Sequence, residues 1–442
     1  MSTRTVLLAA AALGALLQSP AAGAGPVLPQ NAPARSMGVA SCASSLCHGA
    51  IEPWKASNVL QNEYVTWSRS DKHARAYSLL LNARSKEIAG KLGMKEAPHT
   101  ATLCLDCHTH NPPPAQRAET SLLADGVACE ACHGPAGRWL ETHVAPGATH
   151  ADNLRNGLYP TADDVPRARL CLSCHLGTQQ KFVTHKMMAA GHPRMSFELD
   201  TFTQISPPHF KVDADWHSRK GSWDSVRAWA IGQAVAAQEL LALLQSPRGR
   251  DGLFPELVLF DCHACHHPMA EKRNLAARHG AGPGVVRLND ANLLMLRKIA
   301  QRVDAVGAAE FAQQIPRLHT AVASGNDALA QARKTEGMIE RLIPRISAYR
   351  FTADDVSSVL FGLIDDGLAG EYQDYQGAEQ AVMAAQSVAD FMGRRGLLRT
   401  AGLKPAMRRL LGVVANDETY SPRAFEQALR ELKESVQKGM PK

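Results

Sequence analysis

The chain has 442 residues and a formal net charge of +6, from 48 lysines and arginines against 42 aspartates and glutamates. This small excess is not gathered in a basic block, so the sequence gives no indication of nucleic-acid binding. Aromatic residues make up only 5% of the chain, and long alternating runs of valine and isoleucine are missing. We therefore expect a mainly α, loop-rich protein, long enough for two or three domains.

The first residues have the pattern of a secretory signal peptide. Arg4 is the only charge before an apolar run over residues 6–17, and Ala22-Gly23-Ala24 follows as a small-residue cleavage pattern. A membrane anchor is the alternative, but a run of about a dozen residues is too short to span a bilayer unaided. We predict a signal peptide over residues 1–24, export to the periplasm, and a soluble mature protein that begins with a flexible leader over residues 25–40.

The ten cysteines fall into five pairs, and a histidine directly follows the second cysteine of each pair. Four pairs have the C-x-x-C-H spacing that is the attachment signature of c-type haem, and the first pair has a longer spacer of four residues. In chain order the five motifs are Cys42, Cys47 and His48; Cys104, Cys107 and His108; Cys129, Cys132 and His133; Cys171, Cys174 and His175; and Cys262, Cys265 and His266.

This spacing suits the chemistry of haem attachment. Two thiols add to the two vinyl groups of the haem, and the next residue lies under the iron as its proximal ligand. Structural zinc would use sets of four ligands, and disulfides are possible in an exported protein. Neither alternative explains a histidine after every second cysteine, so we predict five covalently bound haem c groups.

Thirteen histidines remain, and twelve of them precede residue 280, in the same part of the chain as the motifs. A second histidine on the iron gives a low-spin haem suited to electron transfer, whereas an iron without one can bind a small molecule. The count allows five haems with two histidines each, and it equally allows four such haems and one open site. A surface histidine without a ligand role is the alternative for each of the thirteen.

The composition of the chain changes after the last motif. Residues 41–283 hold all five motifs, and Pro- and Gly-rich stretches between them indicate loops, so we expect a pentahaem domain there. Residues 222–244 have the pattern of an amphipathic helix, whose aromatic and alanine face could pack on a haem or on other helices. Residues 284–442 lack cysteine and show helical stripes. This predicts a haem-free helical region that covers the haem domain, forms an oligomer contact or docks a partner.

Several short segments between residues 41 and 270 resemble the cytochrome c-554 family, which is related to hydroxylamine oxidoreductase and the pentahaem nitrite reductases. Residues 67–76 (WSRSDKHARA) are similar to the family's W-x-x-S-x-x-H-A segment, and residues 126–135 (GVACEACHGP) to its G-x-x-C-x-x-C-H-G-P haem site. Residues 190–193 (AGHP) are similar to its G-H-P segment. The longer first motif, the fifth motif and the long C-terminal region depart from the family pattern.

The resemblance implies roles for histidines outside the motifs. His73, His143 and His192 lie where the family has distal ligands, and His267 is a candidate because a doubled histidine can ligate a neighbouring haem in other multihaem cytochromes. His185 is a reserve candidate. The predicted metal ligands are the five motif histidines together with His73, His143, His192, His209 and His267.

We expect an electron carrier that works between periplasmic or membrane-associated redox proteins. One alternative is an enzyme that acts on a small nitrogen or sulfur compound at one open haem, with His73 or His217 as proton donor or anion binder. No motif has lysine in place of the proximal histidine, the substitution seen in pentahaem nitrite reductases, so the sequence argues against that enzyme. The other alternative is a docking subunit of a larger redox complex, and the sequence leaves the oligomeric state open.

Overall fold

The computed structural model describes residues 25–441, apart from residues 56, 222, 251–254 and 267–286. The predicted signal peptide and His267 therefore lie outside the described residues. Within the described part, regular structure is almost entirely helical, and β-pairing is limited to two isolated bridges, Ser36–Arg117 and Phe260–Leu288. The predicted mainly α class is confirmed. No helix in this part is both long and apolar enough to cross a membrane.

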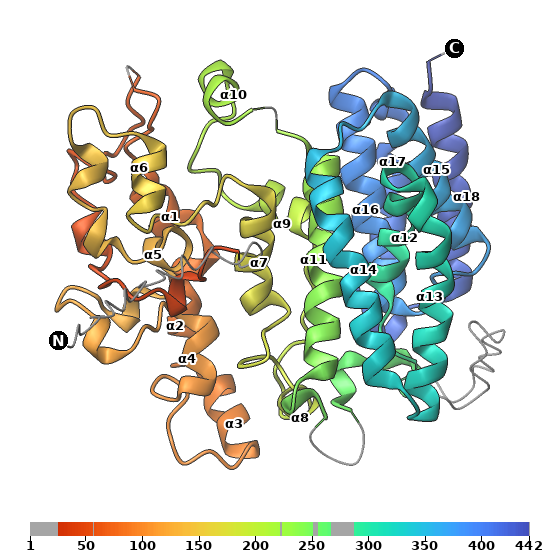
Figure 1. The fold of residues 1–442 in the computed structure, drawn as a ribbon, viewed down its shortest axis with the longest axis horizontal. Coiled ribbons are helices and arrows are strands. Elements are labelled where there is room, and N and C mark those ends of the chain that lie inside the picture. Colours follow the sequence, from red (N-terminus) through yellow and green to blue (C-terminus); the bar gives the residue numbers. More distant parts are fainter. Residues whose placement is uncertain (1–24, 56, 222, 251–254, 267–286, 442) are drawn as a thin grey trace, which may run out of the picture.

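The part of the chain up to residue 220 consists of short helices joined by loops and forms the left half of the molecule in Figure 1. These helices have between 4 and 12 residues. They are α1 (Glu63–Ser70), α2 (Ala76–Leu79), α3 (Ala83–Lys91), α4 (Thr102–His108), α5 (Cys129–His133), α6 (His150–Arg155), α7 (Asp164–His175), α8 (His185–Ala189), α9 (Leu199–Ile205) and α10 (Ala214–Lys220).

Longer helices follow and lie side by side in the right half of Figure 1. We call them the C-terminal bundle, although its first helix precedes the fifth motif. They are α11 (Ser225–Gln245), α12 (Ala291–Val303), α13 (Ala305–Ser324), α14 (Ala328–Ala348), α15 (Ala353–Leu368), α16 (Tyr375–Arg394), α17 (Lys404–Val413) and α18 (Pro422–Gly439).

Local sequence explains where several of these helices begin. Thr352 and Asp355 form a reciprocal capping box at the start of α15, which satisfies backbone N–H groups that have no partner inside the helix. Ser421 caps α18, and Pro422 occupies its first position, where the missing N–H of proline costs nothing.

Helix α11 lies at the centre of the molecule and packs against α14, α12, α16, α7 and α9. Most of its side chains are buried, including Trp229 and Leu241. Its sequence pattern left open whether it packs on a haem or on helices, and the structure shows helix-on-helix packing. Gly232 allows α9 to approach closely, because a Cβ there would lie 2.7 Å from the Cβ of Leu199.

One hydrophobic cluster runs through the C-terminal bundle. The short-helix part joins it mainly through α7 and α9, which contribute Ala168, Leu172 and Leu199. The bundle is thus built around its own apolar core, and α7 and α9 attach the rest of the chain to it.

Candidate haem sites

All ten cysteines lie within the described residues, and none of them forms a disulfide. Nine are partly buried and Cys265 is exposed. The thiols are therefore available for covalent attachment of another group, as the sequence motifs predict.

Three of the four short motifs lie on helices. The second motif ends α4, the third makes up α5 and the fourth ends α7. Residues at positions i, i+3 and i+4 share one face of a helix, so each helix presents two thiols and one imidazole in the same direction. The fifth motif begins on a 3-10 turn (Cys262–Ala264), and a 2.8 Å bond from the His266 N–H group to the Cys262 carbonyl preserves the same spacing.

The longer first motif closes in an equivalent way. The His48 N–H group donates to the Cys42 carbonyl over 3.1 Å, which is the bond made by the histidine of a short motif across its own turn. The two extra residues bulge outward, and Leu46 is 79% exposed. The turn requires Gly49, since a Cβ there would lie 1.9 Å from the Ala43 carbonyl oxygen.

Cys47, the second cysteine of this first motif, departs from the helical arrangement of the second, third and fourth motifs. It lies in a turn over residues 45–48, is partly buried, and its N–H group donates to the Ser44 carbonyl over 2.9 Å. Because Cys47 follows Cys42 by five residues instead of three, the two thiols do not share one face of a helix. The extra loop must therefore bring Cys47 to its vinyl group, and its role in haem attachment stays a prediction.

Each of the five motif histidines faces a second histidine that comes from a different part of the chain. The ring centroids are 6.3 Å apart for His48 and His143, 6.1 Å for His73 and His175, 6.5 Å for His108 and His192, 6.3 Å for His133 and His209, and 6.2 Å for His185 and His266.

These separations can be compared with the space that one iron needs. A metal–imidazole bond is about 2 Å long and each ring centroid lies roughly 1.2 Å beyond its nitrogen, so two imidazoles on opposite sides of one iron have centroids about 6.4 Å apart. The five pairs fit this separation. Each pair also belongs to a motif whose two thiols can hold a porphyrin.

Residues 41–134 match the family model of cytochrome c554 and c-prime. The chain is a c-type cytochrome that resembles this family. The match spans the first three motifs together with His73, and it implies haem c and electron transfer. No curated protein and no solved structure matches the chain.

Hydrogen bonds orient several of the paired rings in this cytochrome. Glu63 bonds to Nδ1 of His48 at 2.9 Å and Asp71 to Nδ1 of His73 at 3.0 Å, and the bond in each case raises the pKa of the imidazole. The Nδ1–H group of His108 donates to the Ala76 carbonyl over 3.0 Å. Such bonds fix the ring and leave Nε2 for a metal, and a carboxylate partner makes the imidazole a better ligand.

Two motif histidines are held in the form that binds metals. Burial lowers the pKa of both His133 and His175 to about 4, so both rings are neutral at physiological pH. A metal ligand must be the neutral imidazole. Phe197 stacks on the His175 ring at 4.7 Å and fixes its orientation.

Contacts between motifs place the candidate haem sites next to one another. The thiol of Cys42 in the first motif lies within interaction range of Cys129 in the third, and the thiol of Cys107 in the second lies within interaction range of Cys174 in the fourth. Cys132 of the third motif lies within electrostatic range of Cys174. Helix α8 then connects two more sites, because His185 begins it and His192 follows its end. These contacts connect the five candidate sites in a row, in the order first, third, fourth, second and fifth motif.

The remaining described histidines do not face a motif histidine. His110 is buried and its ring bonds to the Ser36 hydroxyl at 2.8 Å, while burial lowers its pKa to about 4. His319 is buried, and its Nε2 bonds to Oδ2 of Asp290 at 3.0 Å. His217, a candidate proton donor, is exposed and bonds to the Gly221 carbonyl. His267 and His279 lie outside the described residues.

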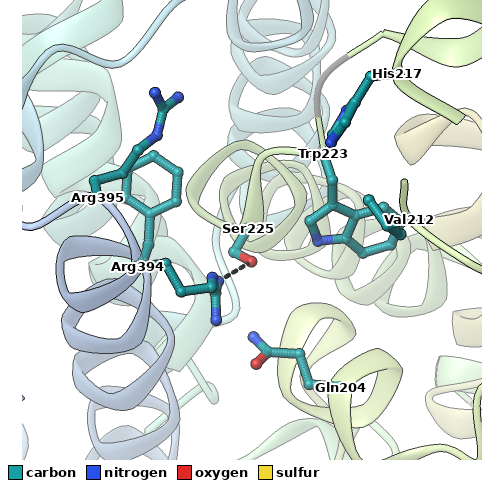
Figure 2. A pocket seen from close by; sticks show the side chains of 8 residues that line it. Gln204, Val212, His217, Trp223, Ser225, Arg394 and Arg395 are labelled. Carbon is teal, nitrogen blue, oxygen red and sulfur yellow. Dashed lines mark hydrogen bonds between the residues drawn. The ribbon is translucent and has the colours of Figure 1, made fainter. Parts of the chain in front are cut away.

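His217 lines a cavity formed by described residues, and a second cavity of similar size lies elsewhere. Figure 2 shows this first cavity, of about 600 Å³, with Trp223 and Val212 beside His217 and with Arg394 donating to the Ser225 hydroxyl over 2.7 Å. None of the ten paired histidines lines it. The second cavity, of about 650 Å³, borders the second motif, with Tyr77 and Leu105 among its lining residues.

His185 is the paired histidine that sequence reasoning ranked lowest. Its one local signal is its place seven residues before His192, upstream of the predicted ligand segment at residues 190–193. Nothing in the sequence indicates which motif it would face, because its partner His266 lies on a separate loop.

Proposed function

We propose that this cytochrome is a periplasmic carrier of five c-type haems that transfers electrons between redox partner proteins. The five histidine pairs carry this proposal, since each motif histidine faces a second imidazole at the distance of a shared iron. Bound haem supplies reversible one-electron exchange at its iron.

The chain's own residues have three tasks in this function. The ten cysteines would bind the porphyrins covalently, the paired histidines would ligate the irons, and groups such as Glu63 and Asp71 keep the imidazole rings in place. Two strong-field imidazoles per iron favour the low-spin state and leave no coordination position for a substrate. This arrangement supports electron transfer over chemistry at an open haem.

The neighbouring thiols support a connected set of sites. The Cys42–Cys129 and Cys107–Cys174 contacts each join two motifs, and such contacts bring the edges of the attached groups together. Electrons can then enter at one site and leave at another without a mobile carrier in between. The partners at the two ends are proposed to be periplasmic or membrane-associated redox proteins.

Export supports the periplasmic assignment. The first 24 residues have the pattern of a signal peptide, and c-type cytochromes of the matched family are typically exported. The signal-peptide pattern and the haem-attachment motifs therefore agree on the compartment.

Ferric EPR on the purified protein, combined with intact mass to count haems, tests the proposal. We expect five covalently bound haems and only low-spin ferric signals. A stable high-spin signal that responds to cyanide or nitric oxide would contradict it and would favour a small nitrogen or sulfur compound as substrate. A mass that corresponds to fewer than five haems would contradict the predicted number.

A further inference from the structure

The fifth motif lies against the C-terminal bundle. His263, between its two cysteines, is only 5% exposed. Its ring lies 5.5 Å from the ring of Tyr375 on α16 and 5.7 Å from that of Tyr420, which precedes α18. The loop that carries the motif is therefore seated in an aromatic pocket of the bundle.

Hydrogen bonds fix the walls of this pocket. The Tyr375 hydroxyl donates to the Val414 carbonyl over 2.7 Å, and the Tyr420 hydroxyl donates to the Tyr372 carbonyl over 3.1 Å. Gln376, the next residue of α16, points its Nε2 group at Sγ of Cys262 over 3.7 Å. The bundle thus contacts one of the two thiols that would bind the haem.

The backbone before the motif is tied to the start of α12. The Asp261 N–H group donates to the Arg287 carbonyl over 2.8 Å, and the Asn289 N–H group donates to the Leu259 carbonyl over 2.9 Å. Arg287 in turn forms ion pairs with Asp290 at 2.9 Å and Asp374 at 2.6 Å, and all three side chains are buried. These contacts fix the position and orientation of the fifth motif relative to the C-terminal bundle.

The opposite imidazole comes from the short-helix part of the molecule. His185 begins α8, and its N–H group donates to Glu256 Oε1 over 2.8 Å. Farther along the same segment, Arg194 pairs with Glu379 of α16 at 2.8 Å. Two bonds thus set the segment that contains α8 at a fixed distance from the loop of the fifth motif, and the His185 ring faces His266.

We propose that His185 is the second axial ligand of the fifth haem and that the C-terminal bundle positions His266 opposite it, with Gln376 as a positioning residue at Cys262. This rests on the proposed function, since it assumes that the fifth motif binds haem. It gives the bundle a specific role, which is to support the fifth redox site at the boundary between the two parts of the molecule. It also assigns a ligand that lies far from the motif in sequence, in place of the adjacent His267.

Two single substitutions in the full-length haem-loaded protein test the ligand. In His185→Ala, ferric EPR should show one of the five haems converted to high spin, with intact mass still giving five haems. In His267→Ala, all five should remain low-spin. High spin in His267→Ala, or five low-spin haems in His185→Ala, would overturn the assignment.

A second pair of variants tests the positioning role. Gln376→Leu removes the N–H donor to the Cys262 sulfur, and because such a donor withdraws electron density from the site, its loss should move one of the five reduction steps to lower potential. Gln386→Leu makes the same change about 15 Å farther along α16. A spectroelectrochemical titration of the Gln386→Leu protein should superimpose on that of the wild type.

Unchanged potentials in Gln376→Leu, or an equal shift in Gln386→Leu, would overturn the positioning role. Different results would contradict the proposed function and the assignment of His185. A high-spin haem in the unsubstituted protein contradicts the proposed electron carrier, whereas five low-spin haems that persist in His185→Ala contradict the pairing of His185 with His266 and leave a five-haem carrier intact.

Discussion

The two parts of this cytochrome are stabilised in different ways. The C-terminal bundle has helices of up to 21 residues around a continuous apolar core that includes Leu294, Leu360 and Val388. The part before residue 160 has short helices and loops, and none of its described residues belongs to that core. It holds three of the five motifs and five paired histidines instead.

This difference shows how a haem-binding chain can fold with few apolar side chains. Helices of four to nine residues are not stable in isolation, and burial of side chains normally supplies the missing free energy. Where haems are bound covalently, the porphyrins provide the apolar surface. We therefore expect the short-helix part to depend on haem and the bundle to be stable without it.

Production of the chain without haem attachment should have the largest effect, because it should unfold the short-helix part and leave the C-terminal bundle folded. We expect amides of α1–α5 to exchange as in an unfolded chain, while α12–α18 stay protected, because only the bundle has its own core. Hydrogen–deuterium exchange with mass spectrometry measures both parts in one sample, and the haem-loaded protein serves as reference. Equal protection in both parts would refute the dependence on haem.

Leu360→Ala should lower the stability of the bundle without changing the haems. Leu360 is fully buried on α15, and loss of such a side chain costs about 2–5 kcal/mol in the free energy of unfolding. Urea unfolding followed by far-UV circular dichroism measures this loss. Val306→Ala, at a position that is 92% exposed on α13, should change the stability by less than about 0.5 kcal/mol. Similar losses in both variants would contradict the position of the core.

His192→Ala should affect one site in the short-helix part and leave the bundle intact. His192 faces His108 with ring centroids 6.5 Å apart, so its removal should convert one of five haems from low to high spin. Ferric EPR measures the change. His150→Ala is the control, because His150 is exposed and faces no motif histidine. An unchanged spin count in His192→Ala would remove His192 from the ligands.

Asp200→Asn should change how the stability depends on pH, at the contact between the two parts. Burial, and next the charge of Glu198, raises the pKa of Asp200 to about 7 from 3.8. A raised carboxyl pKa means that the folded state favours the protonated form. The resulting stability is fully present below about pH 4 and is lost as the pH rises to about 7, by at most about 1.4 kcal/mol per pH unit.

The variant lacks this titration, so its stability relative to the wild type should rise across the same pH window and stay constant above it. Urea unfolding at a series of pH values measures the difference, and the values near pH 4 provide the internal reference. A difference that does not vary between pH 4 and 7 would show that Asp200 does not titrate in this range.

Some of the architecture could be read from local patterns. The mainly α class follows from composition, and residues 222–244 have the helical pattern of α11. The pattern could not say what covers that helix, because alanine-rich faces suit a porphyrin and a neighbouring helix equally well. Only the positions of α12, α14 and α16 show that helices cover it.

The sequence by itself determined where haem can be attached, because the two thiols and the proximal imidazole lie within a short stretch of backbone and their geometry is local. The tertiary structure decided which second histidine faces each motif. His143 reaches His48, and His185 reaches His266, across long stretches of chain. Such pairs depend on how loops and helices pack against one another, and the spacing of residues along the chain does not predict that packing.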